Sequence, residues 1–126
     1  MRRKKTIYPK HLEKGKFYIV HDGSTSGHPG KIDWKNDNKN LYLAVVTGTT
    51  YDRHKTRLKH PTNKSVSVSY VDNRPFMGRR RDFGNKELVG MKFHKDDKPL
   101  IKVIERRKPI YSQTLNRRKK KKIKKT

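Results

Sequence analysis

The chain has 126 residues, of which 29% are hydrophobic and 37% are charged. Thirty-five Lys and Arg against eleven Asp and Glu give a formal net charge of +24. This length fits one small domain, and the low apolar content indicates a modest core with solvated chain ends. The chain contains no cysteine, which excludes disulfides, zinc ribbons and thiol chemistry.

The charge predicts a polyanionic partner. Nucleic acid is favoured, because release of counterions drives contact with a phosphate backbone. An anionic membrane is the competing polyanion, but the sequence has no clear amphipathic or lipidated anchor. No apolar segment is long enough to span a bilayer, and the basic start MRRKKTIYPK lacks the apolar run of a secretory signal. We therefore expect a cytoplasmic protein that does not bind membranes.

The first predicted elements surround one apolar strand. Residues 1–13 form a basic arm, and residues 16–21 are predicted to be a strand because aromatic and β-branched residues follow a glycine. Residues 22–40, which include Trp34, are rich in Gly, Ser, Asn and Asp and predict a long loop. Leu41 to Thr47 is apolar on both faces, so we expect a central strand that is buried on both sides.

The second half of the chain predicts two further strands. The basic stretch 47–62, whose first residue Thr47 ends the central strand, continues as a loop, and residues 65–71 alternate Ser and apolar residues as a half-exposed strand does. Residues 74–84 are a basic segment with aromatic residues near both ends. Residues 87–94 alternate again and predict a strand.

A short helix is predicted near the C-terminal end. Leu100, Val103 and Ile104 have helical spacing, with Asp97 as a cap and Pro99 in the first turn, so residues 99–107 are expected to be helical. A strand is the alternative for this segment. Residues 112–126 are polar and then basic, as in a disordered tail.

These elements predict a mainly β fold. A small barrel or curled antiparallel sheet, with one short C-terminal helix, would occupy residues 14–111. The basic arm 1–13 and the basic tail 112–126 would flank it.

Basic residues interleaved with aromatic residues form the candidate nucleic-acid-binding set. Bases can stack on Tyr or Phe while Arg and Lys neutralise phosphates, and we expect RNA rather than DNA. For Phe76 and Phe83 the alternative is a place in the core. For the tails the alternative is a targeting signal or a solubility role. The set consists of Tyr51, Arg57, Arg74, Phe76, Arg79, Arg80 and Arg81 in the domain, and Arg117, Arg118, Lys119, Lys120, Lys121 and Lys122 in the tail.

Histidines on both sides of the central strand are candidates for acid-base chemistry. His28 precedes the strand, and His54 and His60 follow it together with Arg53. Histidine is the commonest general acid or base near neutral pH, and Arg or Lys can stabilise a phosphate transition state. RNA supplies its own nucleophile, the 2′-hydroxyl, so a metal-free ribonuclease needs only these residue types.

We expect no metal and no cofactor. His54 and His60 are spaced too loosely in an irregular segment to define a metal site, and Asp96-Asp97 fits a helix cap better than a metal pair. The sequence has no nucleotide-binding glycine motif and no hydrolase GxSxG motif.

Over about residues 14–48 the chain resembles the MazF/PemK-type toxin endoribonucleases. The segment Lys14 to Val20 resembles their opening strand, and Leu43 to Thr47 resembles the apolar strand that ends in Val-Val-Ser or Val-Val-Thr. The resemblance implies a small β-barrel that cleaves RNA without metal and is neutralised by an acidic antitoxin. It also implies that Thr47 is the functional Ser/Thr, and a homodimer is considered.

The chain departs from the family pattern before that strand. The family has Arg-Pro leading directly into it, whereas Leu41 and Tyr42 stand there in this sequence, and His28-Pro29 is the nearest analogue. The catalytic Arg of the family therefore has no positional match, and Arg53 is the candidate considered in its place.

Three functions are therefore expected, in order of preference. The first is an RNA-binding protein, and the second is a metal-independent MazF/PemK-like endoribonuclease acting as a toxin. The third is a structural component of a ribosome or virion.

Overall fold

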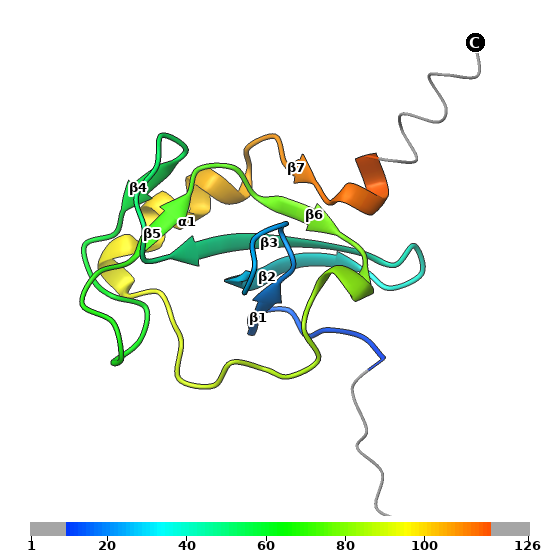
Figure 1. The fold of residues 1–126 in the computed structure, drawn as a ribbon, viewed down its shortest axis with the longest axis horizontal. Coiled ribbons are helices and arrows are strands. Elements are labelled where there is room, and N and C mark those ends of the chain that lie inside the picture. The colour runs from blue at the N-terminus through cyan, green and yellow to red at the C-terminus, as the bar shows by residue number, and fades with distance from the viewer. Residues whose placement is uncertain (1–9, 117–126) are drawn as a thin grey trace, which may run out of the picture.

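The computed structural model describes residues 10–116 (Figure 1). The basic clusters at 2–5 and 117–125 lie outside the described residues, and with them the predicted binding residues Arg117, Arg118 and Lys119 to Lys122. The elements are β1 (Phe17–Val20), β2 (His28–Asn36), β3 (Leu41–Gly48), β4 (Lys55–Arg57), β5 (Tyr70–Asp72), β6 (Phe76–Gly78), η1 (Arg80–Asp82), η2 (Lys95–Asp97), α1 (Lys98–Glu105) and β7 (Ile110–Tyr111).

The fold is mainly β, as predicted, with a curled sheet and a short helix near the C-terminal end. β3 lies at its centre. One edge of β3 pairs with β2, and the other edge is shared between β6, opposite Tyr42 to Ala44, and β5, opposite Thr47 and Gly48. β1 extends the sheet beyond β2, and β4 extends it beyond β5; all of these pairs are antiparallel. β6 and β7 pair in parallel. Figure 1 shows β4 and β5 at one end of β3 and β6 near the other.

Both faces of β3 are buried, which confirms the prediction for this strand. Tyr42, Ala44 and Val46 belong to one apolar cluster, which also contains Tyr18, Ile32, Phe76 and Phe83. Val45 points the other way into a second cluster with Ile101 and Ile104 of α1. Alternating side chains of a strand reach opposite faces, so a single apolar run supplies both cores.

The helix prediction is confirmed at Lys98–Glu105, and the strand alternative is wrong. Pro99 lies in the first turn, where its missing N–H costs nothing. Asp97 is the N-cap residue, but its side chain makes no capping bond. Its carboxylate instead accepts the backbone N–H groups of Lys59 and His60, at 2.8 and 3.1 Å. Asp97 therefore joins the loop after β4 to the start of the helix.

The predicted loop at 22–40 is wrong. β2 occupies His28–Asn36, with a register shift between Ile32 and Trp34. Gly30 and Ile32 are buried on the face of the first core, so pairing with β3 outweighs the polar composition of the segment. Only the two ends of the predicted loop turn the chain. Strand propensity is context-dependent, and here the neighbouring strand decides the outcome.

The predicted strand at 87–94 is also wrong. Val89 is 84% exposed, and Gly90 has a positive φ of 95°, which turns the chain. Its backbone hydrogen bonds are isolated and form no ladder: Leu88 N donates to the Phe17 carbonyl, Lys92 N donates to the Thr62 carbonyl, and the His94 carbonyl accepts from Asp97 N. The alternation of apolar and polar residues was therefore not sufficient to form a strand in this segment.

Three further segments differ from the sequence-based elements. The strand predicted over 65–71 begins only at Tyr70, the loop predicted within 47–62 contains β4, and the basic segment 74–84 contains β6 and η1. The folded part of the chain also extends beyond the predicted domain of residues 14–111. Leu12 is fully buried in the first core, and residues 113–116 are helical. Among residues 10–116, no helix has the length and apolar character needed to cross a membrane.

Candidate functional site

Four residues form a row across adjacent strands at one end of the sheet. Gly48 of β3 lies opposite Tyr70 of β5, and Tyr70 lies opposite Arg57 of β4. On the other edge of β3, a Cβ atom added to Gly48 would lie 3.0 Å from Cδ2 of His28 in β2. Directly opposed residues of antiparallel strands project to the same face. His28, Gly48, Tyr70 and Arg57 therefore share one face, and we call them the transverse row.

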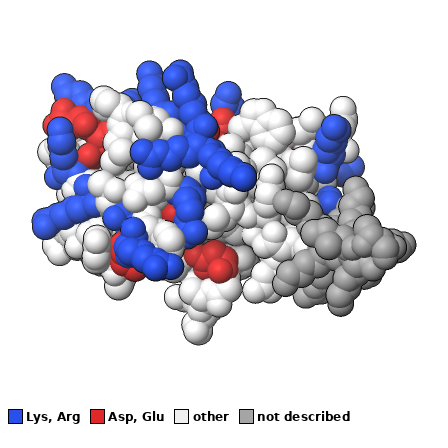
Figure 2. Space-filling model, turned by 90° about the horizontal axis from the view of Figure 1, so that it is seen from above, with Lys and Arg blue, Asp and Glu red and all other residues white. Residues whose placement is uncertain are grey.

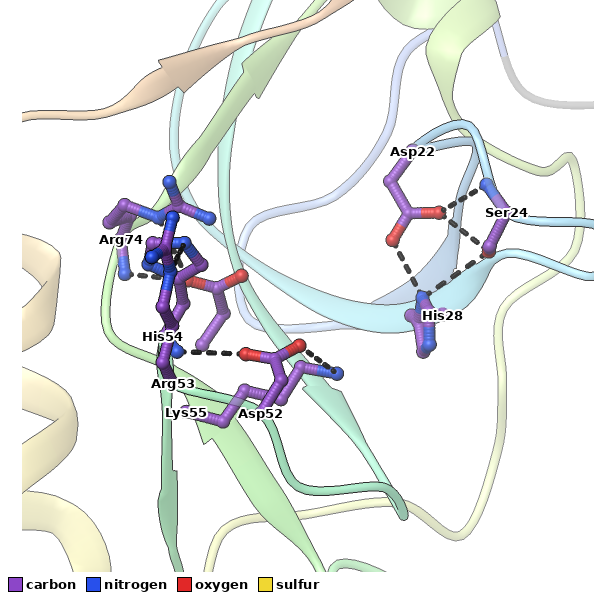
Figure 3. A network of polar contacts seen from close by, with 9 residues as sticks. Asp22, Ser24, His28, Asp52, Arg53, His54, Lys55 and Arg74 are labelled. Atoms are coloured by element: carbon purple, nitrogen blue, oxygen red, sulfur yellow. Dashed lines mark hydrogen bonds and ion pairs between the residues drawn. The ribbon is translucent and has the colours of Figure 1, made fainter.

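The loop between β1 and β2 places a carboxylate against the histidine of this row. His28 Nδ1 lies 2.6 Å from Asp22 Oδ2, and Ser24 Oγ donates to Asp22 Oδ1 at 2.8 Å (Figure 3). Burial raises the pKa of Asp22, but hydrogen bonds from Ser24 and His28 outweigh it and hold the pKa below its ordinary value. An ionised Asp22 fixes the proton of the imidazole on Nδ1, which leaves the Nε2 lone pair free to accept a proton.

Lys55 approaches the same point from β4. Its Nζ lies 3.5 Å from the position that a Gly48 Cβ would take, beside Cδ2 and Nε2 of His28. The side chain is only 12% exposed, and its Nζ is 3.8 Å from Asp52 Oδ2. The backbone N–H of His54 is the main cause that lowers the pKa of Asp52, and Lys55 adds to it. The imidazole of His28 and the ammonium group of Lys55 therefore both border the space that the missing side chain of Gly48 leaves open.

A pocket of about 330 Å³ opens beside this cluster. His28, Thr47, Gly48, Thr50, Thr62 and Asn63 are among the residues that line it. The structure therefore brings together two of the predicted catalytic residues, His28 and Thr47. Thr47 is 2% exposed, and its hydroxyl donates to the Pro29 carbonyl at 3.5 Å, so it forms part of the wall.

The other predicted catalytic residues lie elsewhere. Arg53 Nε donates to His54 Nε2 at 3.3 Å, and Figure 3 shows both residues grouped with Arg74, with Asp52 and Lys55 between them and His28. His60 turns toward η2, where its Nε2 lies 2.9 Å from Asp96 Oδ2. His54 and His60 therefore do not converge on His28.

The predicted nucleic-acid-binding residues divide into two groups. Tyr51 is 64% exposed and contacts Tyr70 edge to face at 5.8 Å between ring centroids, close to the exposed Arg57. Arg74 contacts Asp72, which lies opposite Lys55 on the same sheet face. The basic and aromatic residues of this group, together with Lys55 and with His28 of the transverse row, form a surface at β4 and β5, which we call the β4–β5 surface: His28, Tyr51, Lys55, Arg57, Tyr70 and Arg74.

The second group is largely structural. Phe76 is 3% exposed and packs against Phe83, so its predicted role in base stacking is wrong and the core alternative holds. Arg80 donates to the carbonyls of Phe83 and Gly84 and to the side chain of Asn85. The backbone N–H of Arg79 donates to Asp82, at 2.7 Å. Arg81 is exposed beside them.

The sequence-based candidates did not include Asp22, Lys55 and Tyr70. The available signal was the segment DGSTSGH, in which an Asp and a His bound a Gly- and Ser-rich stretch. That stretch is recognised as a hairpin loop only when residues 28–36 are assigned to a strand. Lys55 and Tyr70 reach the site through strand register, which loop composition does not encode.

Comparisons of the chain with protein-family models, with curated proteins and with solved structures returned no match. The resemblance to MazF/PemK-type toxins stays a prediction, and the chemistry of the site has to be argued from its own residues.

Proposed function

We propose that this protein binds single-stranded RNA through the β4–β5 surface. The observation that carries the proposal is the transverse row, in which Arg57, Tyr70 and His28 lie side by side on one sheet face. A guanidinium group can contact a phosphate, and an exposed Tyr ring can stack on an unpaired base. The exposed ring of Tyr51 beside Tyr70 enlarges the stacking surface.

The charge of the folded part supports this proposal. Residues 10–116 contain 23 Lys and Arg, together with all 11 Asp and Glu of the chain, so they carry a surplus of twelve positive charges without the termini. Figure 2, a view from above, shows many Lys and Arg side chains over the half of the molecule that holds β4 and α1 in Figure 1. Arg57 has no ion pair among the described residues, so its charge is available to a phosphate.

The test is binding of a labelled single-stranded RNA with 2′-O-methyl groups, followed by fluorescence anisotropy at several salt concentrations. The methyl groups prevent attack by the 2′-oxygen, so binding is measured without cleavage. The double variant Tyr51→Ala and Arg57→Ala should bind at least about tenfold more weakly, because base stacking contributes about 1–3 kcal/mol and a phosphate contact adds to it. The exposed Lys86 in the loop before η2 provides the matched control Lys86→Ala.

A chain that ends at residue 116 separates the surface from the tail. It should lose affinity, and it should show a shallower salt dependence, because about 0.7 counterions are released per single-strand phosphate contact. The effect of the double variant should persist in the shortened chain. Equal binding by the double variant and the control, or binding that does not weaken with salt, would contradict the proposal.

A second candidate function, metal-independent RNA cleavage, is favoured by the Asp22–His28 pair beside Lys55. Nε2 of His28 would take the proton of a 2′-hydroxyl as its oxygen attacks the adjacent phosphorus. The bond from phosphorus to the 5′-oxygen then breaks, and the leaving oxygen takes a proton from water. The products are a 2′,3′-cyclic phosphate and a free 5′-hydroxyl. Lys55 would stabilise the negative charge that develops on the phosphate.

The cleavage test uses unmodified RNA in EDTA with purified full-length protein. Cleavage should stop with His28→Ala and persist with His54→Ala, since His54 lies apart from the pocket. As a toxin, the protein should also arrest growth on expression, and His28→Ala should relieve the arrest. Intact RNA across several sequences would remove this second function and leave the binding proposal standing.

A further inference from the structure

A second histidine cluster lies on η2, apart from the β4–β5 surface. His60 comes from the loop after β4, whereas His94 and Asp96 come from the start of η2. The buried carboxylate of Asp97 accepts the backbone N–H of His60 at 3.1 Å, so the main chain that carries the His60 ring is held in place. The imidazoles of His60 and His94 stack with their centroids 3.6 Å apart.

Two of the distances within this cluster are close to those between the ligands of a metal ion. Asp96 Oδ2 lies 2.9 Å from His60 Nε2 and 3.5 Å from His94 Nδ1. One ligand atom from each residue lies within 4.8 Å of the other two. Bonds of about 2.0–2.1 Å in a tetrahedral zinc site separate neighbouring ligand atoms by about 3.3 Å. Two of the three separations therefore already bracket the required value.

We propose that His60, His94 and Asp96 bind a divalent transition metal of the zinc class, with water as the fourth ligand. Two imidazoles and one carboxylate favour Zn²⁺, Co²⁺, Ni²⁺ or Cu²⁺ over Mg²⁺ and Ca²⁺, which prefer oxygen ligands. The site is open, because all three side chains are more than a third exposed. The proposal is independent of RNA binding.

Metal binding replaces two existing contacts. The metal takes the place of the hydrogen bond between His60 and Asp96, and at His94 Nδ1 it replaces the backbone N–H of Asp96, which donates there at 3.0 Å. The two rings must also open from their interplanar angle of 20°, since a metal lies in the plane of each imidazole that binds it. Both changes involve side chains that are more than a third exposed.

The charges around the cluster determine how strongly it is expected to bind a metal ion. Lys59 and Lys95 neighbour the cluster and oppose a cation, whereas the Asp97 carboxylate favours one. Binding should therefore be weaker than in a closed structural zinc site. It should also weaken in acid, because both imidazoles must be neutral to act as ligands. A bound metal would tie the loop that follows β4 to the start of α1.

The experiment is calorimetric titration of the chelator-treated full chain with Zn²⁺, repeated with Mg²⁺. We expect one Zn²⁺ per chain and no binding of Mg²⁺. The variants His60→Ala, His94→Ala and Asp96→Ala should each weaken Zn²⁺ binding about tenfold or more. Their circular dichroism should match that of the parent, because the changed side chains lie at the surface.

Two controls keep the site distinct from other histidines. His54→Ala and His28→Ala should leave Zn²⁺ affinity unchanged. The visible spectrum of added Co²⁺ should show the strong bands of tetrahedral coordination in the parent and lose them in His60→Ala. The absence of saturable Zn²⁺ binding, or equal binding by the parent and both His60→Ala and His94→Ala, would overturn the proposal.

Discussion

Arg57 on β4 and Arg80 in η1 belong to stretches of similar basic and aromatic composition at opposite ends of β3. Arg57 is exposed beside Tyr70 and has no ion pair among the described residues. Arg80 donates to two backbone carbonyls and to Asn85. An arginine has five N–H donors, and a ligand can use only those that the chain leaves unused. The comparison indicates that the first region is suited to binding and the second to holding the fold.

The glycines of the two regions differ in the same way. A Cβ atom on Gly48 would meet His28 and Lys55, which are the candidate functional side chains. A Cβ atom on Gly78 would meet Asp82 Oδ2 and the ring of Phe76, both at 2.9 Å, which belong to the packed interior. Each glycine makes room for its neighbours, but only the neighbours of Gly48 are suited to chemistry.

The largest expected effect comes from Gly48→Val. The added side chain displaces the His28 ring from Lys55, and misplacement of a catalytic group by about 1 Å can lower a rate about 100-fold. Under the second candidate function, RNA cleavage in EDTA should fall by about that factor, with the melting temperature within a few degrees of the parent. A variant that retains full cleavage would show that the approach of His28 to Lys55 does not matter.

Asp82→Asn tests the structural region. The buried carboxylate accepts the Arg79 N–H at 2.7 Å and the Thr114 hydroxyl at 3.1 Å. Loss of the charge should lower the free energy of unfolding by about 2 kcal/mol in urea denaturation, because hydrogen bonds to charged groups contribute that much. Glu87→Gln is the matched control at the surface, where an ion pair with Lys16 should contribute less than about 1 kcal/mol. Equal losses in the two variants would remove the distinction.

Arg57→Ala should mainly weaken RNA binding, whereas Arg80→Ala should mainly lower stability. Arg57→Ala should weaken RNA binding about three- to tenfold and change stability by less than about 0.5 kcal/mol. Arg80→Ala should leave RNA affinity unchanged and lower stability by about 1 kcal/mol, because its hydrogen bonds within the chain are lost. Anisotropy and urea denaturation of the same two proteins provide the check. A loss of RNA affinity in Arg80→Ala would place that guanidinium group in the interface instead.

An effect that depends on pH is expected at Asp33, a carboxylate that contrasts with Asp82. Both Asp33 oxygens are buried without a hydrogen-bond partner among the described residues. Burial, with a smaller contribution from Glu105, raises its pKa to about 7. The folded protein therefore holds a proton that the unfolded chain releases above its ordinary pKa of 3.8. Stability should fall as the pH rises from that value toward 7, and then level off.

Asp33→Asn should remove this part of the pH dependence and raise the melting temperature at pH 8 by several degrees. Thermal unfolding at pH 5 and pH 8 measures both effects. The same change of carboxylate to amide should thus stabilise the protein at Asp33 and destabilise it at Asp82. A parent whose stability rises steadily with pH across this window would contradict the assignment of a raised pKa to Asp33.

Strong local patterns in the amino-acid sequence predicted their elements correctly. The apolar run of β3 and the helical spacing in α1 predicted both elements close to their observed bounds. The prediction failed for residues 28–36, where polar composition concealed a strand, and for residues 87–94, where alternation suggested one that does not form. In each case the neighbouring chain decided the outcome, through pairing with β3 in the first case and through the turn at Gly90 in the second.

The amino-acid sequence by itself determined the mainly β class, the central strand, the short helix and the strong positive charge. Only the tertiary structure decided which basic and histidine residues meet. It placed His28 beside Gly48 and Lys55, moved His60 to His94 and Asp96, and buried Phe76 in the core. The physical reason is that class and charge follow from composition and local spacing. A site instead depends on strand register, which joins residues that are far apart in the chain.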